Sequence, residues 1–314
     1  MNDRKRSPRV VVVGSLVFDL VAWVDQRPGK GETRLGKDFG MFPGGKGANQ
    51  AVQVARMGSE VVMVGRVGDD LFGEEMLQSL QSHGVDTRFV RKDPSTTTAV
   101  GCITVDETGD NSIVMVPQAN MKMTPADVSD ALSSEQRADL LLLQLEIPLE
   151  VNIRAAELAR QKGWTVILNP APAQPLPDRL LSLADYLTPN EIELAMLVGK
   201  ELKNQEEYRQ AARSLLRHSI RGVIVTLGEQ GALVVTHDEE TLHPAFRINA
   251  VDTTAAGDAF TGTLAVALAE KKTLSEGIRL ANAAGALAAT KPGAQPSLAS
   301  REEIETMARE GQRG

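Results

Sequence analysis

The chain of 314 residues contains one cysteine and four histidines. A single cysteine excludes an intrachain disulfide bond, and it cannot supply a zinc site built from cysteine ligands. Cys102 lies in the apolar run VGCITV, which predicts a small buried strand residue and not a nucleophile. The histidines lack the spacing of metal ligands and give no support to a Ser/His/Asp triad; they are His83, His218, His237 and His243.

Long hydrophobic runs and an excess of positive charge are also missing. No stretch approaches the roughly 18 consecutive apolar residues that a membrane-spanning helix needs. The basic segment 1–9 precedes the apolar run 10–14, which is too short for the hydrophobic region of a signal peptide. The formal net charge of −7 argues against nucleic acid as a partner, because nucleic-acid binding depends on basic patches. We therefore expect a cytoplasmic protein with a loose basic tail that binds neither membranes nor nucleic acid.

Two common nucleotide-binding motifs are absent as well. No Gly-x-Gly-x-x-Gly follows the first apolar run, which disfavours a dinucleotide-binding dehydrogenase. Segment 40–47 (GMFPGGKG) comes close to a P-loop, but Gly47 stands where that motif needs a Ser or Thr for magnesium. The segment also does not follow a buried strand directly. The sequence therefore excludes a P-loop at this position.

Short apolar runs alternate with helical segments through most of the chain. The runs are rich in Val, Ile and Leu without polar alternation, as in strands that are buried on both faces of a parallel sheet. This order predicts one domain over 1–314 with a three-layer α/β/α fold and a mostly parallel central sheet. The expected strands are 10–13, 61–65, 140–145, 165–168, 186–187, 222–226 and 233–236, and the expected helices include one that ends at 57, 69–83, 150–162 and 257–269.

Segments 16–42 and 97–121 interrupt this alternation. The first shows partial alternation of apolar and polar residues with two glycines, and the second is typical of a β-hairpin with a polar turn at 106–111. Both leave the main pattern where strands of an open α/β sheet end, which is where such sheets bind ligands. We expect the two segments to form a small β-sheet lid.

The segment 251–260 (VDTTAAGDAF) predicts an anion site at the start of a helix. Small residues precede an apolar run, 259–269, that predicts a buried helix beginning near Gly257. The N-terminus of a helix offers free N–H groups and a partial positive charge, which suit a phosphate. Asp258 would lie beside that anion. From the residues alone it is either an acid at a helix start or a base next to a reacting phosphate.

Two further polar clusters also have two interpretations each. Gly44 and Gly45 permit close approach to a ligand and Asn49 can bind sugar hydroxyls, or the segment is a plain turn before a helix. Asn190 and Glu193 are three residues apart, so they share one helical face. They either hold a magnesium ion through water molecules or form a cap at the helix start.

Segment 226–231 (TLGEQG) follows an apolar run and contains two glycines. The glycines either let the chain wrap around a flat ligand such as a nucleotide or form a tight hairpin with the next strand.

Together these segments resemble the PfkB (ribokinase-like) family of carbohydrate kinases. Segments 44–51 (GGKGANQA) and 252–258 (DTTAAGD) match the two signatures of that family in the same order. The resemblance extends from 10 to 297 and also includes 143–146, 169–173 and 188–191. It implies a ribokinase-like α/β/α fold with a β lid and an ATP-dependent sugar kinase, with ribose to ribose 5-phosphate as the leading reaction.

The resemblance also implies roles for individual residues. Asp258 would take the proton from the primary hydroxyl of the sugar, and the backbone amides of Ala255, Ala256 and Gly257 would form an anion hole. The sugar would contact Asp19, Val17, Gly45, Lys46, Asn49, Glu146 and Asp258. ATP would contact Asn190, Thr226, Gly228, Gly231, Gly257 and Asn282.

Magnesium and potassium are implied in the same way. Glu193 would support Mg²⁺. The potassium ligands, several of them backbone carbonyls, would come from Asp252, Thr254, Ala288, Lys291, Gly293 and Ser297. The lid would pair with the lid of a second subunit in a homodimer, because exposed strand edges seek partners.

Val17 departs from the family pattern. Ribose kinases of the family typically carry Gly-Ser-Ile-Asn-x-Asp after the first strand, whereas this chain has GSLVFD, with Val17 in place of the Asn that contacts ribose. The kinase prediction does not depend on this position, but the choice of ribose does. Deoxyribose, a nucleoside or a fructose derivative remain alternatives. A non-catalytic sensor of sugar or nucleotide is an alternative of another class, against which Asp258 and the Ala-Ala-Gly segment argue.

Overall fold

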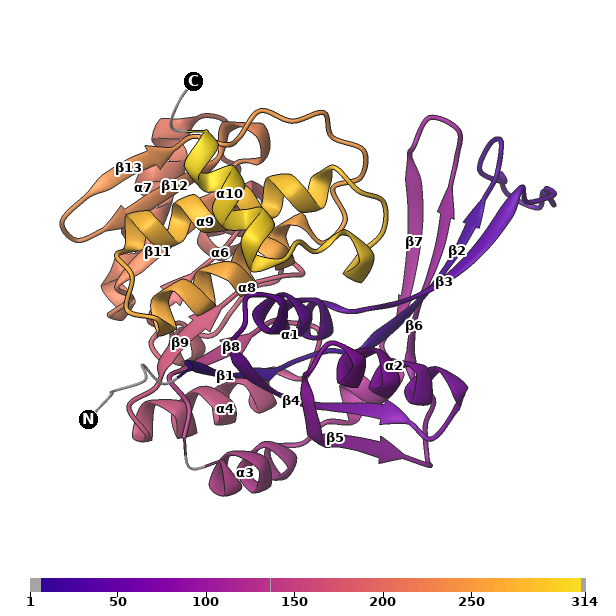
Figure 1. The fold of residues 1–314 in the computed structure, drawn as a ribbon, viewed down its shortest axis with the longest axis horizontal. Helices are drawn as coiled ribbons and strands as arrows, with labels where there is room; N and C mark the ends of the chain where they lie inside the picture. The colour runs from indigo at the N-terminus through magenta and orange to yellow at the C-terminus, as the bar shows by residue number, and fades with distance from the viewer. Residues whose placement is uncertain (1–6, 136, 312–314) are drawn as a thin grey trace.

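A large, mostly parallel sheet forms the centre of the molecule. The computed structural model describes residues 7–135 and 137–311, and within them the sheet has the strand order β13-β12-β11-β10-β9-β8-β1-β4-β5 (Figure 1). All neighbours from β5 to β11 pair in parallel, and β12 and β13 add an antiparallel edge. The strands are β1 Arg9–Val13, β4 Glu60–Gly68, β5 Asp86–Asp93, β8 Leu140–Leu143, β9 Thr165–Leu168, β10 Tyr186–Leu187, β11 Gly222–Thr226, β12 Ala232–Thr236 and β13 Glu240–His243.

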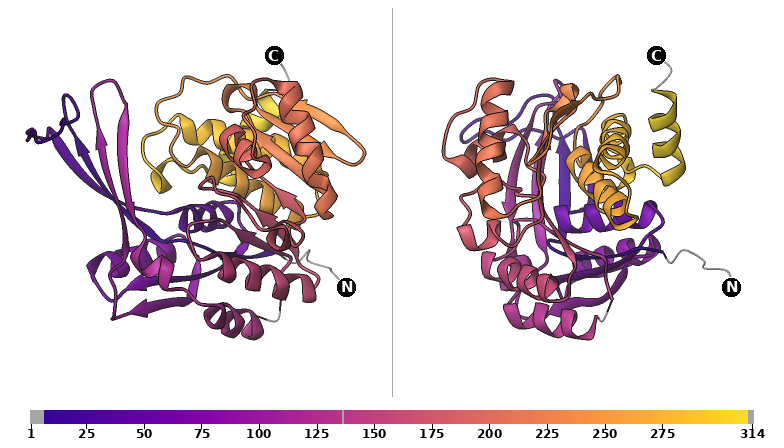
Figure 2. Two further views of the ribbon diagram at one scale, coloured as in Figure 1. Left: turned by 180° about the vertical axis from the view of Figure 1, so that it is seen from behind. Right: turned by 90° about the vertical axis from the view of Figure 1, so that its left-hand side faces the viewer.

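Helices cover both faces of this sheet, so the predicted three-layer architecture is confirmed (Figures 1 and 2). One face carries α3 Pro125–Ser134, α4 Leu149–Gln161, α5 Asp178–Leu181, α6 Glu191–Val198 and α7 Gln205–Leu215. The other carries α1 Lys46–Arg56, α2 Leu71–Ser82, α8 Ala256–Ala269, α9 Leu274–Ala289 and α10 Arg301–Glu310. Short 3₁₀ turns occur at η1 Gln118–Lys122, η2 Leu216–His218, η3 Gly228–Gln230 and η4 Gln295–Ser297.

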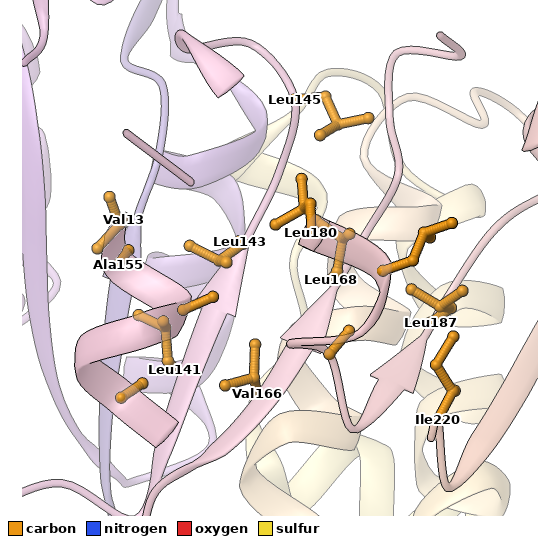
Figure 3. Close-up of a cluster of buried hydrophobic side chains, with 14 of the residues drawn as sticks. Val13, Leu141, Leu143, Leu145, Ala155, Val166, Leu168, Leu180, Leu187 and Ile220 are labelled. Carbon is orange, nitrogen blue, oxygen red and sulfur yellow. The ribbon is translucent and has the colours of Figure 1, made fainter. Parts of the chain in front are cut away.

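The continuous apolar strands supply a core on each face. Successive strand side chains point to opposite faces. Val11 and Val13 therefore join the core under α3 and α4, whereas Val10 and Val12 join the core under α1 and α8. Figure 3 shows part of the first core, where Leu141, Leu143 and Val166 pack against Ala155 of α4 and their neighbours. Each fully buried Leu or Val contributes on the order of 2 kcal/mol to folding, so these strands fix the layers.

A second, smaller sheet stands away from the three layers. Its strands are β2 Val17–Trp23, β3 Asp38–Gly44, β6 Ala99–Val105 and β7 Asn111–Val116, in the order β3-β2-β6-β7 (Figure 1). Strand β2 pairs in parallel with β6, and the outer pairs are antiparallel. The prediction of a small separate β-sheet is confirmed. The strands fall within or next to the two segments predicted for it.

Asn120 joins the point where the chain enters the small sheet to the point where it leaves it. Its side chain accepts a hydrogen bond from the Leu16 amide at 3.1 Å and donates one to the Leu16 carbonyl at 3.0 Å. Leu16 immediately precedes β2, and Asn120 follows β7 in η1. The buried amide thus takes the place of a strand neighbour at the base of the small sheet.

Three expectations about local structure were incomplete or wrong. Cys102 was predicted to be buried, but it is exposed on β6, because no layer covers that side of the small sheet. Strands β5 and β13 were not predicted at all. Both are edge strands with charged residues and no fully buried position, so neither has the apolar signature of the inner strands. The predicted strand 140–145 ends at Leu143.

Within residues 7–135 and 137–311, no helix is long and apolar enough to span a membrane. Of the predicted basic tail, residues 1–6 lie outside the described residues.

Candidate active site

Helix α8 begins without a side-chain cap. The residue before the helix, Ala255, has φ 59° and ψ 6°, which is a left-handed conformation. For a residue other than glycine this conformation costs on the order of 1–2 kcal/mol. Gly257 is exposed, and an added Cβ there would meet no atom within 4 Å. The first turn of α8 therefore opens onto free space, where its N–H groups can meet an anion. The Ala256 amide already donates to the Thr253 carbonyl at 3.2 Å.

The side chain of Asp258 does not cap its own helix and instead faces α1. The residue is buried, and its two carboxylate oxygens accept hydrogen bonds from Asn49 Nδ2 at 3.0 Å and Gln50 Nε2 at 2.9 Å. Asn49 Oδ1 is buried and has no hydrogen-bond partner. A carboxylate and an unpartnered amide oxygen thus lie side by side close to the open turn of α8. This arrangement can accept hydrogen bonds from hydroxyl groups of a ligand.

Asp19 and Glu146 place two further carboxylates near this point. Glu146 accepts hydrogen bonds from the Lys46 backbone amide at 3.0 Å and from the Ser15 hydroxyl. Burial, together with the charge of Glu146, raises the pKa of Asp19 to about 7. A Cβ at Gly44 or Gly101 would come within 2.4 Å or 2.3 Å of the Asp19 carboxylate, so both glycines are required for its position on β2.

The remaining predicted sugar-site residues belong to the same cluster. Burial lowers the pKa of the Lys46 ammonium, but the charges of Asp258, Glu146 and Glu193 outweigh it and hold this pKa above its usual value. Val17 is buried, and Gly45 packs against it with φ 88°, since a Cβ there would come within 2.7 Å of the Val17 amide. The structure therefore brings together Asp19, Val17, Gly45, Lys46, Asn49, Glu146 and Asp258.

Asn190 and Glu193 form a complete capping box at the start of α6. The Glu193 carboxylate accepts from the Asn190 amide at 2.8 Å, and Asn190 Oδ1 accepts from the Glu193 amide at 2.8 Å. Burial raises the pKa of Glu193, although the Asn190 amide and the Lys46 charge lower it in part. The capping interpretation is therefore correct for this structure, and Glu193 also lies near Lys46 and Asp258.

Three of the other residues predicted to contact ATP, Thr226, Gly228 and Gly231, lie at the end of β11 and in the turn after it, whereas Asn282 is on α9 and Gly257 on α8. Asn190 and Thr226 form a parallel β-bridge, and Thr226 starts the turn that joins β11 to the antiparallel β12. The predicted hairpin alternative for 226–231 is thus also correct. Gly231 has φ 102°, and a Cβ there would come within 2.1 Å of the His243 carbonyl oxygen. Asn282 on α9 donates from Nδ2 to the carbonyls of His243 and Pro244 at 3.1 Å each, so it holds the segment at the end of β13 against which Gly231 packs.

Asp252 connects the loop before α8 to the loop after α9. Its carboxylate accepts from the Thr254 amide at 2.9 Å and the Gly293 amide at 2.8 Å, and its own amide donates to the Ala289 carbonyl at 3.2 Å. The segments predicted for potassium binding are therefore adjacent. The Lys291 ammonium bonds Glu303, and the Ser297 hydroxyl donates to Ala294. Throughout 7–135 and 137–311, no group of three or more His, Cys, Asp or Glu side chains could hold a metal ion.

Sequence reasoning missed three amides behind Asp258. Gln50 Nε2 also donates to Asn169 Oδ1 at 3.0 Å, and Gln144 Nε2 donates to Gln50 Oε1 at 2.6 Å. The available signal was the polar pair Asn49-Gln50 in a helix whose other buried residues include Ala48, Ala51 and Val52. Polar residues on the buried face of a helix need partners.

Comparison with known proteins agrees with this arrangement. The family model described as "pfkB family carbohydrate kinase" matches residues 7–301. The chain is 41% identical over 298 residues to the ribokinase of Bacillus subtilis, covering 95% of this chain and 98% of that protein. It is 39% identical over 296 residues to the deoxyribokinase of Salmonella typhi, covering 94% and 97%.

Solved structures show the same fold. The ribokinase of Thermotoga maritima superimposes with a TM-score of 0.88 at 37% identity, covering 96% of this chain and 99% of the other. The ribokinase of Arabidopsis thaliana, solved with ribose and ATP, gives a TM-score of 0.90 at 34% identity, with 97% and 99% covered. A family match over nearly the whole chain and relatives of this identity lead to one conclusion: the chain belongs to the PfkB family of carbohydrate kinases and is an ATP-dependent sugar kinase of the ribokinase type.

Proposed function

We propose that the protein transfers the γ-phosphoryl group of ATP to O5 of D-ribose, which yields ribose 5-phosphate and ADP. The observation that carries this proposal is the buried carboxylate of Asp258 at the uncapped start of α8, beside the unpartnered Asn49 oxygen. Asp258 would act there as the base, and the backbone N–H groups of the first turn of α8 would meet the phosphate.

In this reaction Asp258 takes the proton of the O5 hydroxyl while that oxygen forms a bond to the γ-phosphorus. The bond between the γ-phosphorus and the β–γ bridging oxygen breaks, and its electron pair leaves on ADP. General-base catalysis of this kind contributes about 10²–10⁴-fold in rate. The N–H groups at the start of α8 face the transferring group, and the Lys46 ammonium adds a positive charge next to Asp258.

The sugar hydroxyls would bind to Asp19 and Asn49. Both residues offer acceptor oxygens, and the Asp19 carboxylate lies on the small sheet opposite the layer that holds Asn49. Glu146 is already bonded to Ser15 and Lys46, so it orients the loop before α1 and limits the space for the ligand. Binding from both sides would make the small sheet a lid over the sugar.

The groups at the ends of β10 and β11 fit the adenosine and phosphate parts of ATP. Thr226, Gly228 and Gly231 lie in one turn, Asn190 pairs with Thr226, and Asn282 bonds the neighbouring segment against which Gly231 packs. Mg²⁺ bound to ATP would neutralise phosphate charge, and Glu193 is the carboxylate of this chain placed to hold its water ligands. The capping bonds of Glu193 leave room for this role, since a carboxylate has about four acceptor positions.

A second candidate substrate, 2-deoxyribose, is favoured by Val17. This buried side chain has no polar atom at a position where ribose kinases of the family typically carry Asn. A site without that polar group loses little when the substrate lacks a hydroxyl. The similar identity to a ribokinase and to a deoxyribokinase is consistent with either sugar.

Replacing the base is the most direct test of the reaction. Asp258→Asn should lower kcat by about 10³-fold, because the amide cannot accept the hydroxyl proton. ATP affinity, measured by calorimetry, should change little, since the groups predicted to contact the nucleotide, apart from Gly257, lie on elements other than α8. Thermal unfolding serves as the control for folding. Turnover close to the wild-type rate would remove Asp258 as the base.

The choice of sugar can be tested at Val17. The wild-type enzyme should use 2-deoxyribose about as well as ribose in an ADP-release assay, whereas Val17→Asn should raise the ratio of kcat/KM for ribose over 2-deoxyribose about tenfold or more. Val17→Thr provides a control with a smaller polar group. A wild-type enzyme that strongly prefers ribose would contradict the role assigned to Val17, and a panel of nucleosides and hexoses would test the remaining alternatives.

Sugar binding should depend on pH through Asp19. Its pKa of about 7 means that the carboxyl holds a proton below neutral pH, and the ionised form accepts more hydroxyl bonds. KM for the sugar should therefore fall as pH rises through about 7.

Ionisation of Asp19 also opposes folding, because its carboxyl group ionises near 3.8 in the unfolded chain and only near 7 in the folded protein. Asp19→Asn should accordingly raise the unfolding temperature, more at pH 8 than at pH 5. A KM for the sugar that stays unchanged between pH 6 and 8 would contradict the proposed role of the Asp19 carboxylate in sugar binding.

The loops joined by Asp252 would bind potassium. The ligands would come from Asp252, Thr254, Ala288, Lys291, Gly293 and Ser297, and the ion would stiffen the segment that leads into α8. Replacing potassium chloride with tetramethylammonium chloride at equal ionic strength should lower kcat. Equal rates in the two salts would exclude a cation site that affects catalysis.

The small sheet would also form the contact of a homodimer. Five apolar side chains on its outer strands are exposed, Phe39, Met41, Ile113, Val114 and Met115, and the pairing register places Phe39, Met41 and Val114 together on one face. Such a patch on a soluble enzyme is typical of an interface. Sedimentation should show a dimer that Val114→Asp weakens, whereas Ile192→Asp, an equally exposed position on α6, should leave it intact. A monomeric wild-type protein at micromolar concentration would contradict the proposal.

A further inference from the structure

We propose that Gln50 is a positioning residue that aims the Asp258 carboxylate, and that Gln144 and Asn169 fix the orientation of Gln50. This inference rests on the proposed role of Asp258 as the base. It concerns residues that are separate from the sugar and ATP contacts predicted above. The four side chains come from four different parts of the chain and meet in the interior behind the open turn of α8.

The hydrogen bonds of Gln50 leave its amide one possible orientation. Both N–H groups of Nε2 are used, one toward Asp258 at 2.9 Å and one toward Asn169 Oδ1 at 3.0 Å. Oε1 accepts from Gln144 Nε2 at 2.6 Å. A flipped amide would place its oxygen against two acceptor oxygens and its nitrogen against a donor. Since Gln50 is fully buried, water cannot compensate for such a mismatch.

The partner of Gln50 is fixed in turn. Asn169 Nδ2 donates to the Thr188 carbonyl at 2.9 Å, so its Oδ1 must face Gln50. Gln144 follows β8 directly and is fully buried, and Asn169 follows β9. The donor direction at Gln50 is therefore set by two strand ends of the central sheet, which are among the most rigid parts of such a fold.

Through Gln50, these amides hold the Asp258 carboxylate in an orientation that does not depend on whether a substrate is bound. Asn49 holds the other carboxylate oxygen, but its free Oδ1 lies where the sugar would bind, so Asn49 can shift when the sugar arrives. Gln50 has no atom left for a ligand. A base that is misplaced by about 1 Å can lose about 100-fold in rate, so the donor that does not move with the substrate has catalytic value.

A matched pair of variants tests the proposal. Gln50→Met keeps the size of the side chain and removes the donor to Asp258. Gln53→Met makes the same change one turn later on α1, where Gln53 is equally buried and donates to the Ala299 carbonyl at 3.2 Å without contacting Asp258. Gln50→Met should lower kcat by about 10- to 100-fold, with a small change in KM for the sugar. Gln53→Met should leave kcat near the wild-type value at a comparable loss of thermal stability.

Gln144→Leu adds a second, independent readout, because Gln144 does not touch Asp258. It should lower kcat in the wild-type background and have no further effect in Gln50→Met, since residues that act as one unit are not additive. The proposal is overturned if folded Gln50→Met has the wild-type kcat, or if Gln144→Leu lowers kcat equally in both backgrounds. If Gln50→Met does not fold, wild-type kcat in folded Gln144→Leu overturns it.

Asp258→Asn in the same assay distinguishes a failure of the proposed base from a failure of the proposed positioning role of Gln50. Retained turnover there would mean that the proposed base is wrong. An inactive Asp258→Asn together with a fully active Gln50→Met would mean that the base is right and the positioning role is wrong.

Discussion

The close packing of α8 against α1 is the contact on which the site depends. Gly262 makes it possible, because a Cβ at that position would come within 2.9 Å of Gln53 Cβ and 3.0 Å of the Gln50 carbonyl oxygen. With the two helices this close, Asp258 reaches Asn49 and Gln50 directly. A larger residue at 262 would separate the helices and move the carboxylate away from both amides. The geometry of the cluster of Asp258, Asn49 and Gln50 thus depends on residue 262 having no side chain.

Helix α1 also connects this contact to the small sheet. Gly47 packs so tightly against the end of β1 that a Cβ would come within 2.6 Å of the Ser15 amide, and the Lys46 amide shares Glu146 with the Ser15 hydroxyl. The site that results is rich in carboxylates, with Lys46 as the cation among them. These carboxylates repel a ligand with several phosphate charges, whereas the start of α8 and the Lys46 ammonium attract it. The charge distribution therefore orients such a ligand as well as binding it.

Most of the fold could be predicted from the sequence because its inner strands are buried on both faces. The run 10–13 carries an unmistakable pattern, whereas the edge strand β5 mixes Arg and Lys with apolar residues and resembles a loop. For Cys102, local hydrophobicity predicted burial, but exposure depends on whether another layer covers the strand. The two signature segments indicated which residues belong to the site. Sequence alone could not reveal that the capping pair Asn190 and Glu193 lies near Lys46, nor that Gln50, Gln144 and Asn169 meet, because these facts depend on distances between remote segments.

The bonds between Asn120 and Leu16 have a consequence for how this protein can change over evolution. These bonds join the start of the small sheet at Leu16 to its end at Asn120. This end of the sheet is therefore held independently of the turns at the opposite end. Residues 24–37 and 106–110, between the strands of the small sheet, can vary in length without disturbing that junction. The small sheet can therefore be remodelled by insertion or deletion while the three layers stay intact. A fold of this construction can acquire new substrates without first losing its chemistry.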